Sequence, residues 1–454
     1  MSLISINPFS GEILKKIDEW NIQEIKKKIK ICYNSQKKWQ NISNNQKKDY
    51  LKNIVNILGK NKKKYSKIIT LEMGKPILQS KFEIEKCIKL CDYYSENSEI
   101  FLKDEIVKTD AKKSYVKYSP LGIILGIMPW NFPFWQVFRW AIPSLIAGNI
   151  CILKHSSNVP QCGMIIEDIF QESGIGENIF CNIPIKSKNI NYLIKNNSIS
   201  AISLTGSSFA GAKMAEIAGS ALKKNILELG GSDPFIVLPD ADLKKTVDMA
   251  IKSRMQNNGQ SCIAAKRFVV HENIFEDFKD SFINKTEKLI IGDPIDEKTD
   301  IGPLARKDLV DEIDEQVKTS VKLGAKILTG SEKIESKGFF YPPTVLTNIK
   351  NKMPVYNQET FGPIAPLIKV KNDKEAIKIA NDTIYGLGAS IWTNDYDKAR
   401  KILNKIRAGS IFINEIVKSD PRLPFGGIKK SGYGRELSHY GIKEFVNIQT
   451  IYIK

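Results

Sequence analysis

The sequence predicts an α/β fold built from parallel strand–helix–strand units, preceded by a helical region and closed by a terminal strand. Residues 22–105 carry apolar side chains at helical spacing among lysines, as at Ile22, Ile25 and Ile29. From about residue 115 onward, short apolar runs are separated by helical segments, the order that parallel sheets require. Residues 446–453 alternate between apolar and polar side chains, as a strand does. Since 454 residues exceed one ordinary core, we expect two or three domains.

After the helical region, each element follows from a short pattern in the chain. The apolar run 122–128 predicts a buried strand, and the tail predicts a strand that either extends its own sheet or pairs with another subunit. The other predicted strands are 149–154, 199–204, 226–227, 233–238, 266–270 and 408–413, with helices at 134–147 and 208–219.

The net charge of +18 raises the possibility of a nucleic-acid partner, but its distribution argues against one. Lysine occurs beside isoleucine and asparagine throughout the chain. This distribution is typical of solvated surfaces and not of one basic stripe interleaved with aromatic residues. The most apolar segments, 121–128 and 141–153, are interrupted by Gly, Pro or Asn and are too short to span a bilayer. We therefore expect neither a nucleic-acid nor a membrane partner.

The chain contains seven cysteines without regular spacing and only three histidines. A chain of this size needs no disulfides, and its N-terminus lacks the pattern of a secretory signal, so a cytoplasmic location is expected. Cys87 and Cys91 share a helix face, but no further ligands follow at suitable spacing, and we expect no metal site.

Cys262 lies in an Asn/Gly/Gln/Ser turn, 34 residues after Glu228 in the glycine-bounded segment LELGG. A thiol in such a turn, with a carboxylate on a second segment, is typical of covalent catalysis with a positioned base. Taken alone, a lone cysteine is more often an inert apolar residue than a nucleophile. The surrounding motifs decide between the two.

Several small motifs follow predicted strands, where α/β sheets bind ligands. Asn131, in the segment PWNFP (129–133), offers an amide N–H to an oxyanion, or else the segment is a turn packed on aromatic rings. Gly206 and Ser207 open a predicted helix, where backbone N–H groups can bind phosphate, although the G-x4-G spacing is a weak signal. Lys154 lies at the end of another predicted strand. Its ammonium group either binds a ribose hydroxyl or a phosphate, or it is an ordinary solvated lysine at a strand end.

Two glycine-containing segments stand nearer the C-terminus. In ETFGP (359–363), the carboxylate of Glu359 stands two residues from the aromatic ring of Phe361. Either the pair binds a ribose hydroxyl and packs against a ring of the ligand, or the segment is a surface turn. The glycine-dense run 424–436 predicts a tight loop that passes close to a bulky group.

Six segments, in this order, resemble the aldehyde dehydrogenase superfamily, and the resemblance covers essentially the whole chain. They are PWNFP (129–133), SLTGSSFAG (203–211), LELGG (227–231), GQSC (259–262), ETFGP (359–363) and PFGGIKKSGYGRE (424–436). The resemblance implies that Cys262 attacks an aldehyde, that Asn131 and the backbone N–H of Cys262 stabilise the oxyanion, and that Glu228 activates water against the thioester. It also implies cofactor contacts from Trp130, Lys154, Ser157, Gly206, Ser207, Glu359 and Phe361.

Cofactor preference is predicted from Ser157, three residues after Lys154. NAD-preferring relatives often carry Glu at this position, whose charge binds a 2′-hydroxyl and repels a 2′-phosphate. Ser157 removes that repulsion, so NADP is expected to be preferred, with NAD also possible.

The substrate is predicted from Arg139, eight residues after Asn131 and so on nearly the same helix face. Succinate-semialdehyde dehydrogenases are similar here, and the resemblance implies that Arg139 and Ser419 hold the distal carboxylate. Gln256 replaces an arginine that some of these enzymes carry. Other short aldehydes, such as glutarate semialdehyde or an uncharged aliphatic one, remain alternatives, as does a surface salt bridge for Arg139. A non-catalytic nucleotide-binding or nucleic-acid-binding descendant is a more distant alternative.

The resemblance also implies the domain organisation. A Rossmann-like nucleotide-binding domain is expected at residues 1–101 and 121–230, a catalytic α/β domain at 231–436, and an oligomerisation arm at 102–120 and 437–454. Since the arm of this family pairs across subunits, a homodimer or homotetramer is expected.

Overall fold

The computed structural model describes residues 2–332 and 334–454, which form three sheets and an N-terminal hairpin. The hairpin pairs β1 (Ser2–Ile6) with β2 (Ile13–Asp18), and four helices follow, as the periodicity predicts. They are α1 (Ile22–Gln40), α2 (Asn44–Lys60), α3 (Lys62–Met73) and α4 (Ile77–Phe101). The first two begin at capping boxes, in which Asn21 and Ser43 accept from backbone N–H groups of the first turn.

The predicted strand–helix alternation forms a six-stranded sheet with the order β17-β9-β8-β5-β6-β7, parallel except for β17. Its strands are β5 (Ile123–Met128), β6 (Ile150–His155), β7 (Phe180–Asn182), β8 (Ile199–Thr205), β9 (Lys224–Glu228) and β17 (Gly432–Tyr433). Its helices are α5 (Trp135–Ile146), α6 (Pro160–Glu172), α7 (Ile190–Lys195) and α8 (Ser208–Ser220), with the 3₁₀ turn η1 (Ser187–Asn189). The chain runs outward from β5 through β6 to β7, then returns to β8 on the other side of β5. Ligands of open α/β sheets bind at such a reversal, beyond the carboxyl ends of the strands.

Helix α5 packs directly on this sheet, and all of its residues are buried. Gly126 on β5 allows the close approach, because a Cβ added there would lie 2.0 Å from Cζ2 of Trp140. The sequence thus holds α5, which carries Arg139, tightly against the strand that leads to Asn131.

The second α/β region forms a seven-stranded sheet with the order β12-β13-β14-β11-β10-β15-β16, parallel except for β12. Its strands are β10 (Asp233–Val237), β11 (Ala265–His271), β12 (Lys326–Thr329), β13 (Thr344–Thr347), β14 (Ile364–Val370), β15 (Gly388–Trp392) and β16 (Ser410–Ile413). The helices are α9 (Leu243–Met255), α10 (Glu272–Thr286), α11 (Lys307–Lys322), α12 (Pro354–Asn357), α13 (Asp373–Asn381) and α14 (Tyr396–Leu403), with the turn η2 (Gln256–Gly259). An aromatic cluster around Phe235, Phe268 and Trp392 fills its core.

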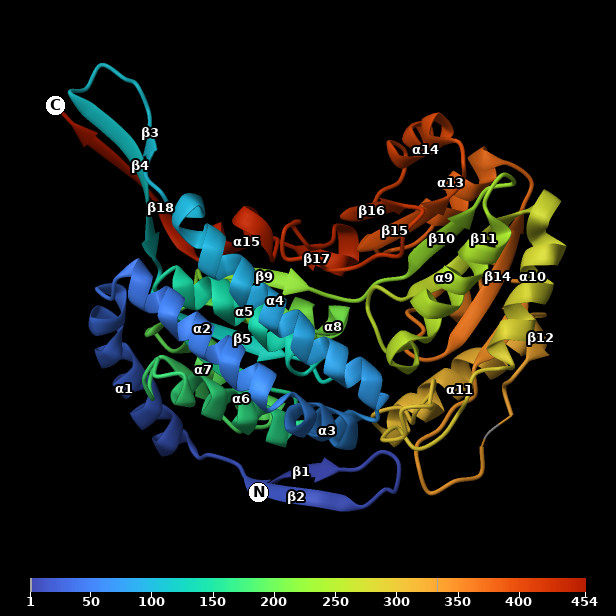
Figure 1. Ribbon diagram of the computed structural model, residues 1–454, viewed down its shortest axis with the longest axis horizontal. Helices are drawn as coiled ribbons and strands as arrows, with labels where there is room; N and C mark the ends of the chain where they lie inside the picture. Colours follow the sequence, from blue (N-terminus) through green and yellow to red (C-terminus); the bar gives the residue numbers. More distant parts are fainter. Residues whose placement is uncertain (1, 333) are drawn as a thin grey trace.

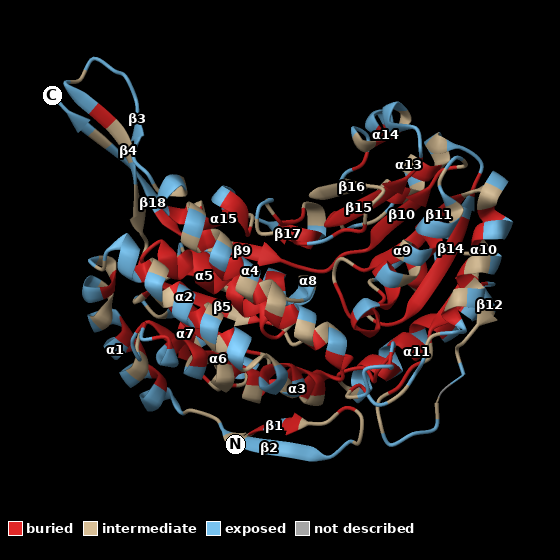
Figure 2. Ribbon diagram, viewed as in Figure 1, coloured by how far each residue is buried: buried red, intermediate tan, exposed pale blue. Residues whose placement is uncertain are grey.

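A three-stranded sheet, which we call the arm, projects from the body at one end of the molecule (Figure 1). It consists of β3 (Glu105–Ile106), β4 (Lys113–Pro120) and β18 (Val446–Ile453), and β18 pairs antiparallel with the whole of β4. The last helix, α15 (Ser438–Lys443), and the turn η3 (Lys429–Ser431) precede β18. Figure 2 shows that most of the arm is exposed, whereas the sheets of the body are buried. The role of the arm in oligomerisation stays a prediction.

The predicted helices and strands are therefore confirmed, with ends that mostly differ by one or two residues. The helical region predicted for 22–105 is the exception, because α4 ends at Phe101 and Glu105 begins β3. The predicted domain ranges stay a prediction, and one detail of the structure bears on them. Strand β17 falls within residues 231–436 but pairs with β9 of the six-stranded sheet. Across residues 2–332 and 334–454, the helices are too short or too polar for any of them to cross a bilayer.

Candidate active site

Two cavities meet at Cys262, which lies in the turn between η2 and β11. The larger cavity, about 500 Å³, opens at the carboxyl ends of β5 and β8, and the smaller cavity, about 190 Å³, lies between α4, α5 and the loop after β16. Cys262 and Gln136 line both cavities. The thiol is thus the point at which two binding spaces converge, as a nucleophile between two reactants requires.

The turn that carries Cys262 is held by buried side chains that fix its backbone. Asn257 and Asn258 adopt φ values of 55° and 56°, in the left-handed region that asparagine tolerates. Asn258 Nδ2 donates to the carbonyls of Gly74 and Pro303, and its Oδ1 accepts from the N–H of Gly302. These contacts tie the turn to two distant segments.

Lys266 binds the same turn from β11, and the sequence reasoning missed it. Its Nζ donates to the carbonyl oxygens of Ser261 and Cys262, each at 2.8 Å, and lies 3.6 Å from Oε1 of Glu359. The sequence offered no clear signal, because β11 carries two adjacent charges near its start, Lys266 and Arg267, and only the structure shows that both are buried.

Burial raises the pKa of the Cys262 thiol to about 11, and the nearby charges of Lys266 and Arg139 oppose that rise. The thiolate is the reactive form of a cysteine, and a pKa of about 11 leaves this thiol protonated at neutral pH.

Asn131 lies on the wall of the larger cavity, directly after β5, and is 4% exposed. One of its amide hydrogens is donated to the carbonyl of Gln260 at 3.1 Å, and Asn257 Nδ2 donates to the carbonyl of Asn131 at 2.8 Å. Since an amide nitrogen carries two hydrogens, one donor remains for a ligand oxygen. Asn131 thus lies beside the turn that carries Cys262, and its role at an oxyanion stays a prediction.

His155 fixes the loop that carries Asn131. Its Nδ1 accepts from the N–H of Ser156 at 2.9 Å, which places the proton on Nε2, where it is donated to the carbonyl of Pro133 at 3.0 Å. Burial lowers the pKa of His155 to about 4, so the ring is neutral and serves as a structural link between β6 and the loop.

Glu228 lies at the end of β9, is 2% exposed and lines neither cavity. Its carboxyl packs against Gly426 of the glycine-dense loop, where an added Cβ would lie 2.7 Å from Oε1. Burial raises the pKa of Glu228 well above its usual range, with Arg139 opposing the rise. The sequence places Glu228 on the right strand, but in this structure its carboxyl is turned away from the cavities.

Five of the predicted cofactor residues line the larger cavity. Gly206 and Ser207 lie at the N-terminus of α8, where Ser207 caps the helix by accepting from the N–H of Ala210. The ring centroids of Trp130 and Phe361 are 5.7 Å apart, edge to face. On the same wall Oε1 of Glu359 accepts from the N–H of Gly231 at 3.0 Å.

Lys154 and Ser157 lie at the end of β6, outside the lining of the larger cavity. Strand β6 neighbours β5 on the side away from β8, so the two residues extend the same sheet edge beyond that cavity. Ser157 is exposed, and burial lowers the pKa of Lys154 to about 8.

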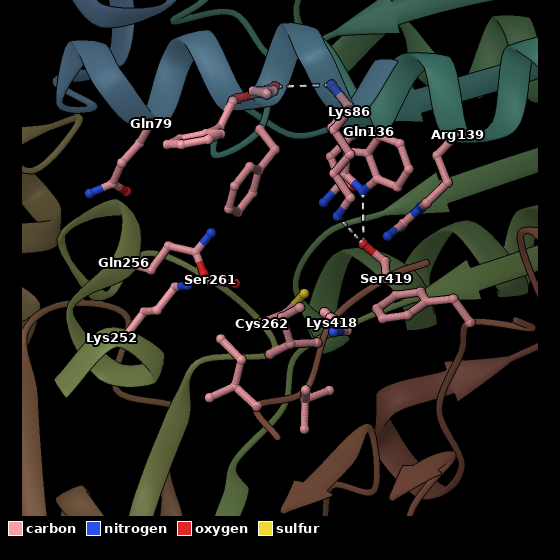
Figure 3. A pocket seen from close by; sticks show the side chains of 18 residues that line it. Gln79, Lys86, Gln136, Arg139, Lys252, Gln256, Ser261, Cys262, Lys418 and Ser419 are labelled. Atoms are coloured by element: carbon pink, nitrogen blue, oxygen red, sulfur yellow. Dashed lines mark hydrogen bonds between the residues drawn. The ribbon is translucent and has the colours of Figure 1, made fainter. Parts of the chain in front are cut away.

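The smaller cavity is rich in cations, which come from Lys86, Arg139, Lys252 and Lys418 (Figure 3). Arg139 lies there, as predicted, but its Nε forms a buried ion pair with Glu436 and its Nη2 donates to Thr205 Oγ1 at 3.4 Å. The predicted Ser419 also lies in this wall and accepts from Lys86 Nζ at 2.6 Å. The sequence reasoning missed Lys86, which lies on α4.

Comparisons with known proteins agree with this geometry. The model of the "Aldehyde dehydrogenase family" matches residues 2–451. "Probable succinate-semialdehyde dehydrogenase [NADP(+)]" of Synechocystis is 45% identical over 453 residues, with 100% of both chains covered. "Succinate-semialdehyde dehydrogenase [NADP(+)] 1" of Mycobacterium bovis is 43% identical over 456 residues, also with 100% of both covered.

Among solved structures, the succinic semialdehyde dehydrogenase from Streptococcus pyogenes in complex with NADP+ superposes with a TM-score of 0.97. It is 36% identical to this chain, and 99% of each chain is covered. The similarity to all three proteins thus extends over both cavities and the arm, and the resemblance found in the sequence is confirmed. The chain belongs to the aldehyde dehydrogenase family.

Proposed function

We propose that this aldehyde dehydrogenase oxidises succinate semialdehyde to succinate, with NADP preferred over NAD. One observation carries the proposal: Cys262 lies between a cavity lined by cations and a second cavity at the reversal point of the six-stranded sheet. The names of the full-length relatives point in the same direction. The cationic cavity suits an aldehyde with a distal carboxylate, and the second suits a dinucleotide.

The residues around the larger cavity fit NADP. The N-terminus of α8, at Ser207, provides N–H groups and a positive dipole end for a pyrophosphate. Glu359 and Phe361 provide a carboxylate for a ribose hydroxyl and a ring surface. Ser157 is uncharged and exposed, so it does not repel a 2′-phosphate. When bound, the nicotinamide ring supplies the acceptor for the hydride that leaves the substrate carbon.

The protein groups account for the remaining chemistry. Cys262 loses its thiol proton to solvent, Sγ forms a bond to the aldehyde carbon, and the free amide hydrogen of Asn131 stabilises the resulting oxyanion. After oxidation to the thioester, Glu228 takes a proton from a water whose oxygen bonds to the acyl carbon, and the carbon–sulfur bond breaks. For this step the Glu228 carboxyl must ionise and rotate from Gly426 towards Cys262.

Arg139 and Ser419 are the proposed contacts for the distal carboxylate. Because Arg139 already shares its charge with Glu436, it supports the positive potential of the cavity less strongly than a free guanidinium would. Glutarate semialdehyde is the second candidate substrate, since its carboxylate would meet the same groups.

An aldehyde panel tests the proposal. Rates with succinate semialdehyde, glutarate semialdehyde and butanal are compared for the wild type and Arg139→Ala, followed by nicotinamide absorbance. Succinate semialdehyde is expected to give the highest kcat/KM, and the variant to lose more on the charged aldehydes. Equal losses on all three would remove Arg139 from the carboxylate site.

We further propose a homodimer or homotetramer in the cytoplasm. The two edge strands β16 and β18 support assembly, because each ends its sheet with unpaired backbone groups, and β18 exposes Ile448, Tyr452 and Ile453. The irregular cysteine set supports the location. Light scattering on a chain truncated after residue 445 is expected to give fewer subunits per particle than the full chain. An unchanged number of subunits would overturn the assembly proposal.

A further inference from the structure

Two donor groups converge on the hydroxyl oxygen of Ser419 in the wall of the smaller cavity. Lys86 Nζ donates to Ser419 Oγ at 2.6 Å, and Trp135 Nε1 donates to the same oxygen at 3.0 Å. Lys86 Nζ also lies 4.1 Å from the centroid of the Trp135 ring, which holds the ammonium group in place. In the view of Figure 3, Ser419 lies between Lys86 and Cys262.

This arrangement determines where the Ser419 hydroxyl hydrogen points. A hydroxyl oxygen has two lone pairs, and the two donors fill both of them. Ser419 is 4% exposed, and no group among residues 2–332 and 334–454 accepts its hydrogen. The hydrogen is therefore available to an acceptor inside the cavity.

Lys86 also lacks a carboxylate of its own in the part of the chain that the structure describes. Two acidic side chains lie near it, but each is already paired: Glu83 with Lys75, and Asp420 with Arg422 at 2.7 Å. Arg139, the other large cation of this wall, is paired with Glu436. Lys418 is paired with Glu415 at 2.8 Å, so among the cations that line this cavity Lys86 is the one that contacts Ser419 without a carboxylate partner.

We propose that Lys86 is the principal binding residue for the distal carboxylate of the aldehyde, with the Ser419 hydroxyl as its partner donor. The inference rests on the proposed function and names the residue that sets its specificity. It also explains how the cavity can bind a carboxylate although Gln256, which stands where some relatives carry arginine, has no charge. In this chain Lys86 of α4 provides the cation.

The environment of Lys86 makes this site sensitive to pH. Enclosure of the ammonium group lowers its pKa to about 7; Arg139 on α5 contributes to that fall, and Glu83, Cys87 and Asp420 oppose it. Lys418 adds a further positive charge to the cavity wall. As pH rises through 7 the free enzyme loses this charge, so selection for a carboxylate is expected to weaken, whereas oxidation of an uncharged aldehyde keeps its own pH profile.

The test compares Lys86→Met, Lys86→Arg and wild type on succinate semialdehyde and on butanal, which has the same carbon chain without the carboxylate. For Lys86→Met, kcat/KM is expected to fall about 10- to 100-fold on succinate semialdehyde, mostly through KM, and less than about threefold on butanal. Lys89→Met, an exposed position one turn further along α4, is the matched control and is expected to resemble wild type.

The pH profile separates binding from a merely structural role. Between pH 6 and pH 8.5, wild type is expected to lose preference for succinate semialdehyde over butanal. Lys86→Arg is expected to keep a constant preference, because arginine stays charged. Melting temperatures of all variants verify folding.

Each other outcome contradicts the inference. Equal losses on both aldehydes in Lys86→Met would make Lys86 structural, and an unchanged preference would leave the carboxylate to Arg139, with the proposed function intact in both cases. A wild-type enzyme that oxidises butanal but no aldehyde bearing a carboxylate would overturn the inference and the proposed function together.

Discussion

The raised pKa of the Cys262 thiol, which is partly exposed at the meeting point of two cavities, leads to a quantitative prediction for its reactivity without cofactor. With a pKa of about 11, the thiolate fraction at pH 7 is about 10⁻⁴, against about 3 × 10⁻² for an ordinary thiol of pKa about 8.5. A thiolate of higher pKa is intrinsically more nucleophilic, which recovers roughly tenfold of that 300-fold deficit. Alkylation of Cys262 at pH 7 is therefore expected to be about 30-fold slower than that of free cysteine.

The assay is alkylation by iodoacetamide from pH 6 to pH 10.5, with the Cys262 peptide quantified by mass spectrometry and Cys262→Ala as the control. The rate is expected to rise through pH 10, where an ordinary thiol has already reached its plateau. Lys266→Met removes the largest charge that lowers this pKa, so the rate at fixed pH is expected to fall further. A plateau reached by pH 9 would show that the pKa of Cys262 is not raised.

Three further predictions concern the cofactor residues and the buried ion pair. Ser157→Glu is expected to lower the NADP-over-NAD ratio of kcat/KM about 5- to 100-fold, from one like-charge contact of about 1–3 kcal/mol; an unchanged ratio would contradict it. Gly230→Ala places a Cβ 2.3 Å from Glu359 Oε2 and displaces that carboxylate. The KM for NADP is therefore expected to rise about tenfold, with little change in Tm. An unaltered KM would show that Glu359 does not bind the cofactor. Glu436→Gln leaves Arg139 buried and unpaired, and urea unfolding is expected to show a loss of about 3–5 kcal/mol; a loss below about 1 kcal/mol would contradict it.

The fold was predictable because its signals are local and repeated. Apolar runs bounded by glycine predict the strands, and apolar residues at helical spacing predict the N-terminal helices. The position of Asn131 and Gly206 around one space was also predictable, because the carboxyl ends of parallel strands share one edge of a sheet. Cys262 precedes β11 of the other sheet, so its place at this space depends on how the two sheets pack together.

The sequence could not predict contacts that depend on the packing of distant segments. Lys86 precedes Cys262 by 176 residues, and Glu436 follows Arg139 by 297, so no local pattern connects either pair. Lys266 resembles any solvated lysine until its strand is buried on both faces. The Glu228 carboxyl packs against Gly426, which is almost 200 residues away in the chain, so no spacing along the chain reveals this contact.

The most direct test of the proposed function is the initial rate of nicotinamide reduction by the purified wild-type protein with succinate semialdehyde. We predict that kcat/KM with NADP exceeds the value with NAD, exceeds the value with butanal and NADP, and is lost in Cys262→Ala. A protein that reduces neither nicotinamide cofactor with this aldehyde, or that prefers butanal, would contradict the account.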